Sequence, residues 1–246
     1  MAKYSIFVPF YNEEKILEPH TLRVYNYLKK QGYDFDIYLV NDSSKDKSQE
    51  IAQKLSKKYQ EIYVLSYTNG PSRRENLFFS FPKSSSRILA FTDIDLAVNE
   101  KYFEKLFSEL ESQNADICTA SRYEPNSIVS RSLFRRIISM AYRKTIQTLF
   151  QCPVSDFQCG FKAFKRQSFM KVLKECKYDH SFKRGWFFDA EILIRAHKKG
   201  MKIVAIPVEW NSGKQSSFKF FRDVKVIPYM LKLWWNLRNS APSKNA

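Results

Sequence analysis

Two acidic residues, Asp93 and Asp95, stand one residue apart directly after the apolar run 88–91. If that run is a strand, both carboxylates lie at its end and can share a hard divalent cation such as Mg²⁺ or Mn²⁺. The cation would bridge them to phosphate oxygens of a substrate. The alternative is a turn whose aspartates cap backbone groups and face solvent. Because the pattern fits both interpretations, the neighbouring elements have to decide between them.

Two other strand-like runs also end in polar residues. The run 35–41 is followed by Asp42, which is suited to accepting hydrogen bonds from a base or ribose, or to capping the next helix. The run 5–9 is followed by Tyr11 and Glu13, suited to stacking on a base and reaching a ribose, or else to a plain polar loop. Because carboxyl ends of parallel strands meet at one edge, the three segments together outline one nucleoside-diphosphate cleft.

The first half of the chain alternates between strand-like and helix-like segments. Strands are predicted over residues 5–9, 35–41, 62–67, 87–92 and 116–120. Helices are predicted over residues 21–31, 45–59, 73–81 and 100–111. This alternation is typical of an α/β fold with a mostly parallel, Rossmann-like sheet flanked by helices.

The second half has a different character. Helices are predicted over 132–150 and 187–199, and a strand over 202–210. The first of these helices is apolar on one face and basic on the other, and the tail 218–238 is aromatic and basic, with Pro228 interrupting it. Such amphipathic segments suit the surface of an anionic membrane. The alternative is an aromatic stripe that packs in the core and a basic face that is merely solvated.

The net charge lies in the second half. The 246 residues include 41 Lys and Arg against 25 Asp and Glu, a net charge of +16. Residues 1–120 hold 16 basic and 17 acidic residues, whereas residues 121–246 hold 25 and 8. This excess indicates an anionic partner: nucleic acid, a nucleotide or a membrane surface.

Several signals are missing from the chain. The 4 cysteines show no CxxC spacing, so we expect reduced thiols and no zinc site. The 6 glycines form neither a dinucleotide fingerprint nor a P-loop. The N-terminus lacks the apolar stretch of a signal peptide, and no uncharged apolar run approaches the roughly 18 residues of a membrane span. We therefore expect a cytoplasmic protein without a transmembrane anchor in this sequence.

Six segments, in order along the chain, carry a resemblance to a known family. VPFYNE (8–13), NDSS (41–44) and DID (93–95) resemble the successive motifs of family 2 glycosyltransferases of the GT-A fold. SRY (121–123), DFQCGFK (156–162) and WFFDAE (186–191) resemble segments of polyprenyl-phosphate sugar transferases. Among these, dolichyl-phosphate β-glucosyltransferases are the nearest match and dolichyl-phosphate mannosyltransferases the next. The resemblance runs from residue 5 to about residue 222.

The resemblance implies roles for individual residues. Positions that hold the donor nucleotide are matched by Pro9, Tyr11, Glu13, Asp42 and Asp93, and those near its phosphates by Arg73 and Arg74. The metal-binding pair is matched by Asp93 and Asp95. Acceptor-phosphate positions are matched by Arg122, Arg135 and Ser139, with Arg131 competing for the place of Arg135. The implied catalytic set is completed by Asp189 and Glu191, which match acidic positions near the sugar.

Three departures from the family pattern bear on the donor. Asn41 stands where an Asp is more common, and residues 69–76 replace a Gly/Lys-rich segment. Ala97 stands where mannosyl relatives place a metal-ligating Gln, and glucosyl relatives also have a small residue there. Together with the segment 158–162, Ala97 favours UDP-glucose over GDP-mannose.

The prediction is an inverting, metal-dependent enzyme that moves a hexose from a nucleotide sugar to polyprenyl or dolichyl phosphate. A phosphomonoester, with a second pKa of about 6, is largely dianionic at pH 7 and needs arginines rather than a general base. We expect one glycosyltransferase domain over 1–217, with a nucleotide-binding half (1–120) and an acceptor half (121–217). An amphipathic segment over 218–246 is expected at the cytoplasmic face of a membrane.

Three other interpretations remain open at this point. A transferase acting on a saccharide hydroxyl would need a carboxylate base, for which Asp189 or Glu191 is the candidate. A nucleic-acid-binding protein would fit the net charge, but no recognised binding module appears, and we expect no nucleic-acid partner. A scaffold that has lost catalysis is disfavoured by the intact Asp93 and Asp95 pair.

Overall fold

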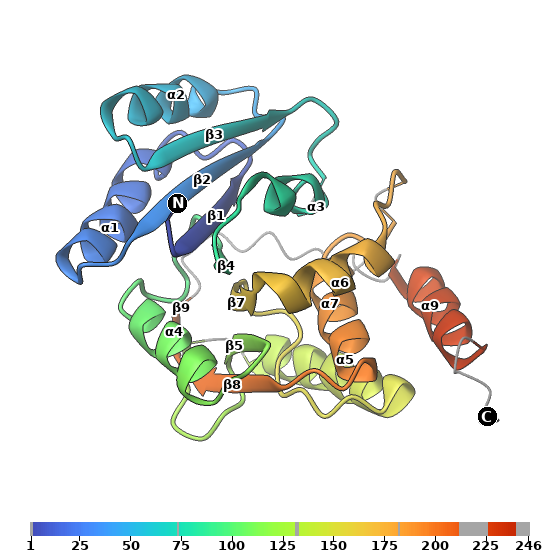
Figure 1. Ribbon diagram of the computed structural model, residues 1–246. Helices are drawn as coiled ribbons and strands as arrows, with labels where there is room; N and C mark the ends of the chain where they lie inside the picture. The colour runs from blue at the N-terminus through green and yellow to red at the C-terminus, as the bar shows by residue number, and fades with distance from the viewer. Residues whose placement is uncertain (1, 73, 131–132, 182, 212–225, 240–246) are drawn as a thin grey trace.

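The computed structural model describes residues 2–72, 74–130, 133–181, 183–211 and 226–239 (Figure 1). Its main sheet has seven strands in the order β3-β2-β1-β4-β7-β5-β8. These strands are β1 (Tyr4–Phe10), β2 (Phe35–Asp42), β3 (Ile62–Tyr67), β4 (Ile88–Thr92), β5 (Ile117–Ser121), β7 (Phe161–Lys165) and β8 (Ile203–Pro207). Only β7 runs antiparallel to its neighbours, β4 and β5. Two short strands, β6 (Ile128–Ser130) and β9 (Glu209–Asn211), form a separate parallel pair.

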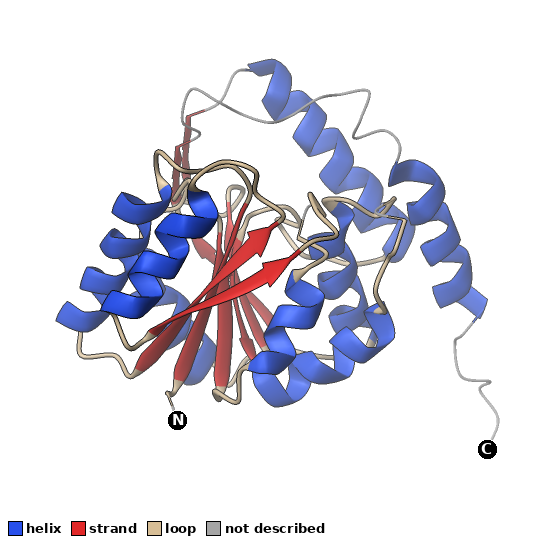
Figure 2. Ribbon diagram, turned by 90° about the horizontal axis from the view of Figure 1, so that it is seen from above, coloured by secondary structure: helices blue, strands red, loops and turns tan. Residues whose placement is uncertain are grey.

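Helices cover both faces of the main sheet (Figure 2). The helices of the chain are α1 (Leu17–Lys30), α2 (Ser48–Lys58), α3 (Leu77–Ser80), the 3₁₀ turn η1 (Phe81–Lys83), α4 (Tyr102–Ser112), α5 (Leu133–Phe150), α6 (Arg166–Cys176), α7 (Phe187–Lys198) and, at the periphery, α9 (Ile227–Asn239). Alternate strand residues face opposite sides, so Ile6 and Val8 of β1 join a core with α1, α2 and α4. Phe7, between them, joins a second core with α6 and α7. The sheet is therefore buried on both faces, as parallel sheets are.

The structure confirms the predicted α/β class and the mostly parallel sheet. The predicted strand 62–67 matches β3, and the other strands of the first half agree to within one or two residues. The helix expected over 73–81 is shorter, because residues 74–76 form a turn and Asn76 is held by a side-chain hydrogen bond to Asp42. The strand expected over 202–210 divides at Val208 into β8 and β9.

Three elements were not predicted: β6, β7 and α6. Pro228 does not interrupt the C-terminal helix but lies in the first turn of α9, where its missing N–H costs no intrahelical hydrogen bond. Of the predicted tail, residues 218–225 and 240–246 lie outside the described residues.

Candidate active site

The loops after β1 and β2 are fastened to each other at the carboxyl edge of the sheet. The backbone N–H of Asn12 donates to Ser44 Oγ at 3.0 Å. Burial, followed by the negative charge of Asp95, raises the pKa of Glu13, so Glu13 lies close to the acidic pair after β4. Two other predicted nucleoside contacts are partly buried at the same edge: Pro9, near the end of β1, and Tyr11, just after it.

Arg74 bridges acidic residues from two different elements. Its guanidinium pairs with both carboxylate oxygens of Asp93 and with Oδ2 of Asp189. The guanidinium carbon also lies 4.8 Å from the ring centre of Trp186. Arg74 is only 7% exposed and Asp189 only 1%, so water screens their attraction weakly. The loop before α3, the end of β4 and the start of α7 therefore meet at one point.

Arg74 and the buried Lys162 compensate only part of the negative charge at this point. Burial raises the pKa of Asp189, against the opposing effect of Arg74, and its Oδ1 has no hydrogen-bond partner among the described residues. Partial loss of solvation and then repulsion from Asp93 raise the pKa of Asp95, although its side chain remains exposed. Closely spaced carboxylates of this kind favour a cation between them.

Asp93 and Asp95 fit a Mg²⁺ or Mn²⁺ ion. Mg²⁺ in proteins commonly takes one or two carboxylates and completes its coordination with water and substrate phosphates. Within the described ranges, no group of three or more His, Cys, Asp and Glu is placed to hold a metal ion.

Gly160, just before β7, allows the close approach on which the site depends. The Asp93 N–H donates to the Gly160 carbonyl oxygen at 3.0 Å. A Cβ atom at position 160 would lie 2.0 Å from Asp93 Oδ2 and 2.5 Å from an Arg74 nitrogen. The antiparallel insertion of β7 beside β4 thus brings a residue without a side chain against the Asp93 carboxylate.

Gly160→Ala is therefore expected to displace Asp93 and Arg74 and to weaken binding of UDP with Mn²⁺ by roughly tenfold or more, measured by calorimetry. Gly200→Ala is the matched control, because a Cβ there meets nothing within 4 Å and the φ of +70° affects only stability. Wild-type affinity in Gly160→Ala would show that the Asp93 position is not critical for the donor.

Asp42 fastens the segment that carries Arg74. Its Oδ2 accepts the Ser72 N–H at 2.6 Å, and its Oδ1 accepts the Ser72 hydroxyl and the Asn76 amide, each at 2.6 Å. A Cβ at Gly70 would lie 2.1 Å from the Asp42 carbonyl oxygen, so this approach requires glycine. The structure thus ties Asp42 to the segment just before α3, and its contact with a nucleoside stays a prediction.

Arg122 is buried against Asp156. Its Nε and Nη2 donate to the two oxygens of Asp156 at 2.7 and 2.8 Å, and its backbone N–H donates at 3.0 Å. Burial alone would raise the pKa of Asp156, but the charge and N–H groups of Arg122 hold this pKa below its ordinary value. The predicted phosphate ligand therefore already carries a carboxylate partner, which positions the loop after β5.

The other predicted acceptor residues belong to α5. Arg135 and Ser139 lie one turn apart, and Ser139 Oγ donates to the Arg135 carbonyl oxygen at 2.9 Å. Arg73 and Arg131 lie outside the described residues. The acceptor set therefore comes from two elements, and the structure does not bring Arg122 and Arg135 into one described contact.

The two acidic residues of α7, Asp189 and Glu191, have different partners. Asp189 faces Arg74, whereas Glu191 is 0% exposed with both oxygens engaged. Its Oε1 accepts Arg195 Nε at 2.7 Å, and its Oε2 accepts Arg184 Nη1 at 2.8 Å. Glu191 is thus held in an ion network and does not contact the Asp93 and Arg74 pair.

Sequence reasoning left three residues of the site without a role. Trp186 and Gly160 lie in the WFFDAE and DFQCGFK segments, but their contacts with Arg74 and Asp93 depend on the folded chain. Lys162 is fully buried, and its charge opposes the rise in the Asp189 pKa. The only signal for all three was membership of those two segments.

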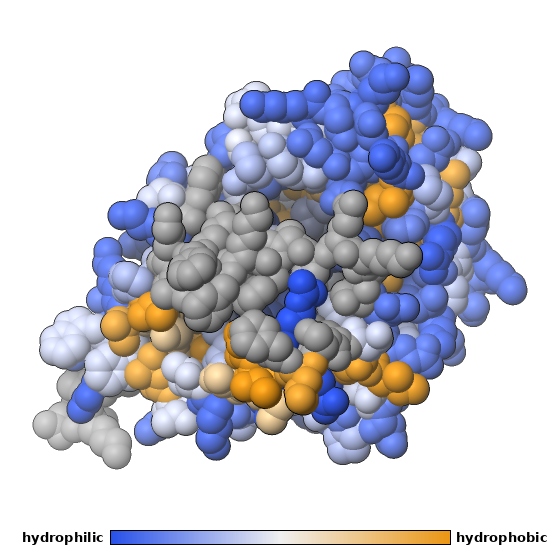
Figure 3. Space-filling model, turned by 180° about the vertical axis from the view of Figure 1, so that it is seen from behind, coloured by the Kyte–Doolittle hydropathy of each residue, from blue (hydrophilic) through white to orange (hydrophobic). Residues whose placement is uncertain are grey.

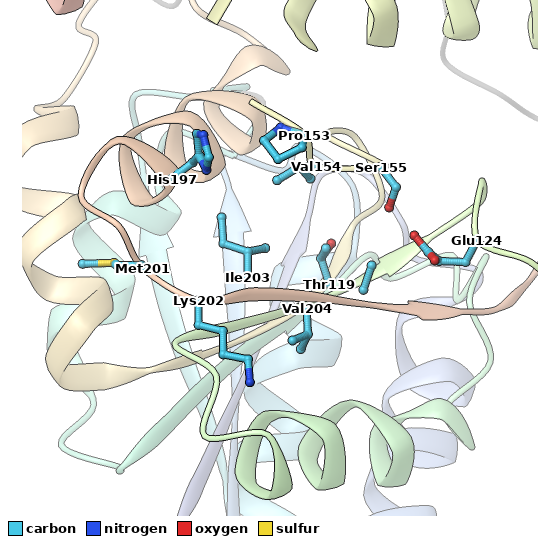
Figure 4. Close-up of a pocket in the computed structure, with 11 residues that line it drawn as sticks. Thr119, Glu124, Pro153, Val154, Ser155, His197, Met201, Lys202, Ile203 and Val204 are labelled. Carbon is cyan, nitrogen blue, oxygen red and sulfur yellow. The ribbon is translucent and has the colours of Figure 1, made fainter. Parts of the chain in front are cut away.

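A pocket of about 440 Å³ lies beside β8, the edge strand at the opposite end of the sheet from β3. Figure 4 shows His197 from α7 and the residues 153–155 above the strand, with Ile203 and Thr119 below them. None of the predicted site residues lines this pocket.

Exposed apolar side chains form one stripe on α5 and one on α9. Their members recur every three or four residues, as on one helix face. They are Leu133, Ile137 and Met140 on α5, and Ile227, Leu231 and Trp235 on α9. Exposed basic residues lie on the same helices: Arg136, Lys144, Lys232 and Arg238. Figure 3 shows apolar side chains gathered along the lower part of the rear face.

Helices that could cross a bilayer are absent from the part of the chain that the structure describes.

Comparison with known proteins places this geometry in a family. The family profile described as "Glycosyl transferase family 2" matches residues 5–173. Dolichyl-phosphate beta-glucosyltransferase ALG5A of Trichomonas vaginalis is 30% identical over 238 residues, covering 93% of this chain and 72% of that protein. The corresponding Saccharomyces cerevisiae enzyme is 26% identical, covering 94% and 76%. Glycosyltransferase AglD of Haloferax volcanii is 28% identical over 96% of this chain, but the chain spans only 38% of its length.

A solved structure shares the fold. Glucosyl-3-phosphoglycerate synthase from Mycobacterium tuberculosis, in complex with Mn²⁺, UDP and glucosyl-3-phosphoglycerate, aligns with a TM-score of 0.71 at 16% identity. The alignment covers 94% of this chain and 79% of the synthase. The profile match over most of the sequence, the relatives and the arrangement of the strand-end acids agree: the chain belongs to glycosyl transferase family 2.

Proposed function

We propose that the protein is an inverting, metal-dependent hexosyltransferase that moves glucose from UDP-glucose to a polyprenyl phosphate such as dolichyl phosphate. The observation that carries the proposal is the meeting of Asp93, Arg74 and Asp189 at the carboxyl edge of the sheet, where ligands of such sheets bind. The names of the relatives support the acceptor and the sugar. The Mn²⁺ and UDP of the synthase support the metal and the nucleotide.

The donor side of the mechanism follows from charge. The leaving group is a diphosphate, which gains negative charge as the bond between the sugar C1 and its oxygen breaks. Asp93 and Asp95 would hold the divalent cation, which supplies several kcal/mol of stabilisation to that charge when bound. Arg74 pairs directly with the Asp93 and Asp189 carboxylates, and its guanidinium is expected to exchange a carboxylate for a phosphate oxygen.

The acceptor side needs no proton transfer. A dianionic lipid phosphate attacks C1 from the face opposite the diphosphate, so its oxygen forms the new bond while the old bond breaks and the configuration inverts. The chain's task is to orient that phosphate, for which Arg is suited by its bidentate geometry. Arg135 and Ser139 on α5, with Arg122 and Arg131, are the proposed ligands.

We place the protein peripherally on the cytoplasmic face of a membrane, since its acceptor is anchored in lipid. The apolar stripes and basic residues of α5 and α9 support this placement, because cytoplasmic leaflets are anionic and attract basic amphipathic helices.

Trp235→Ala is expected to lower binding to phosphatidylserine-containing vesicles by roughly tenfold, because the lost ring no longer enters the interface. Co-sedimentation with the vesicles measures the bound fraction of each protein. Tyr63→Ser on β3 is the control, since Tyr63 is also exposed but lies on neither stripe. Equal binding of Trp235→Ala and wild type would contradict the assigned surface.

The test of the proposed function is a partition assay. The protein is incubated with Mn²⁺, dolichyl phosphate and radiolabelled UDP-glucose or GDP-mannose, and label is counted in the organic phase. Organic-phase label from UDP-glucose alone is the expected result. Label from GDP-mannose alone would change the donor, and label from neither would refute a lipid-phosphate acceptor.

A saccharide hydroxyl is the second candidate acceptor. The buried Asp189, with its raised pKa and unpartnered Oδ1, has the properties of a general base. Asp189→Asn would abolish transfer to a hydroxyl, whereas attack by a phosphate would be reduced less. Label in the aqueous phase that depends on Asp189 would favour this candidate.

A further inference from the structure

A buried ion network joins α7 and α9 to the segment that carries Arg74. Arg184 is 0% exposed, and its Nε and Nη2 donate to the two oxygens of Glu75 at 2.7 and 2.6 Å. Its Nη1 donates to Glu191 Oε2 at 2.8 Å. The Tyr229 hydroxyl, from α9, donates to the same Glu191 oxygen, also at 2.8 Å. One arginine thus links two carboxylates, and one of these is also held by α9.

The guanidinium of Arg184 has no donor to spare. Its remaining N–H groups donate to the carbonyl oxygens of Cys176 at 2.9 Å and Lys177 at 2.8 Å, at the end of α6. All five N–H donors of an arginine are therefore engaged. A buried charge with these partners cannot shift without breaking several hydrogen bonds.

Glu75 connects this network to the donor site. Its neighbour Arg74 pairs with Asp93 and Asp189, and the other side of the loop is held by Asp42. The φ of Arg74 is +78°, an uncommon conformation for a side chain other than glycine. Such a conformation persists only where surrounding contacts impose it, so the place of Arg74 depends on the contacts of Glu75.

α9 has two distinct faces. Met230 and Leu233 are buried in the core shared with α7, and the Tyr229 ring centre lies 6.1 Å from that of Phe187. The opposite face bears the exposed apolar stripe that includes Trp235. Tyr229 therefore packs against α7 with its ring and reaches the ion network with its hydroxyl.

We propose that Tyr229 and Arg184 are positioning residues that couple the docking of α9 to the placement of Arg74, and hence to donor binding. When α9 is docked, the Tyr229 hydroxyl binds Glu191. Glu191 and Glu75 both bind Arg184. Glu75 thereby fixes the segment that carries Arg74. Coupling free energies are reciprocal, so donor binding in turn favours docked α9. The proposal rests on the proposed function only for the identity of the donor.

The test is Tyr229→Phe in the full chain, which removes one hydroxyl and keeps the ring. Hydrogen exchange is followed at the Leu77 and Phe78 amides, which donate to the Arg74 and Glu75 carbonyl oxygens. Exchange there is expected to accelerate roughly tenfold, the factor for one hydrogen bond to a charged group, while exchange in β1 stays unchanged. The affinity for UDP with Mn²⁺ is expected to fall several-fold.

Tyr25→Phe is the matched control, because the Tyr25 hydroxyl also donates to a carboxylate, Glu61 Oε2, at 3.1 Å. It is expected to leave the Leu77 and Phe78 amides unchanged. Accelerated exchange confined to α9 in Tyr229→Phe would overturn the coupling. If the wild type binds no UDP, but Tyr229→Phe still accelerates exchange at the Leu77 and Phe78 amides, the proposed donor is refuted. The coupling between α9 and the segment that carries Arg74 would remain supported.

Discussion

Replacing Asp95 by Asn is expected to lower kcat/KM for sugar transfer by roughly 10²–10³-fold, several kcal/mol of transition-state stabilisation. The change keeps the oxygen that accepts the Ala97 N–H at 3.1 Å and removes only the negative charge. Asn is a weak ligand for a hard cation, so the diphosphate would leave without full compensation of its charge. Steady-state kinetics with saturating Mn²⁺ measure the effect.

The same substitution is not expected to destabilise the fold. Asp95 is exposed to solvent, so the loss of its charge leaves no buried group without a partner. The Tm without metal should therefore stay close to that of the wild type.

Asp36→Asn is the matched control for this charge removal. Asp36 lies near the start of β2, away from the carboxyl edge, and burial also raises its pKa. The Asp36→Asn variant is expected to transfer sugar at the wild-type rate. Transfer by Asp95→Asn within threefold of wild type would contradict a metal role for this carboxylate.

The sheet edge was predictable from the sequence because it depends on local patterns. Apolar runs ending in acidic residues define strands, and parallel strands place their carboxyl ends together. Asp93 and Glu13 accordingly lie just after β4 and β1, and Asp42 is the last residue of β2. No spatial information beyond strand alternation was needed for this part.

The partners of these residues were not predictable, because they depend on long-range packing. Arg184 and Glu75 meet across 109 positions, and nothing local marks either residue. Arg122 and Asp156 were both noticed as motif members, but their mutual pairing requires β7 to enter the sheet antiparallel between β4 and β5. The same insertion brings Gly160 against Asp93.

These pairings change the interpretation of two residues named from the sequence. A motif assigns Glu191 to the sugar and Arg122 to the phosphate, whereas each is engaged by a buried partner of opposite charge. Buried ion pairs of this kind hold elements in register when every donor and acceptor is satisfied. We therefore expect their substitution to affect stability as well as activity.

Arg184→Met is expected to produce the largest loss of stability of any single change considered. The substitution leaves two buried carboxylates, Glu75 and Glu191, without their common partner. Removing one member of a buried pair costs about 3–5 kcal/mol, because the remaining charge stays desolvated. For a chain of this size, that corresponds to a fall in Tm of roughly 6–20 °C, measurable by calorimetry.

Arg23→Met provides the comparison for Arg184→Met. Arg23 also pairs with a glutamate, Glu100, at 2.7 Å, but its side chain is 45% exposed. Surface pairs contribute about 0–1 kcal/mol, so this variant should melt within roughly 4 °C of the wild type. If Arg184→Met also melted in that range, the buried network would contribute no more than a surface pair. It would then be too weak to hold Glu75 and Arg74 in place, and the coupling between α9 and the donor site would lose its physical basis.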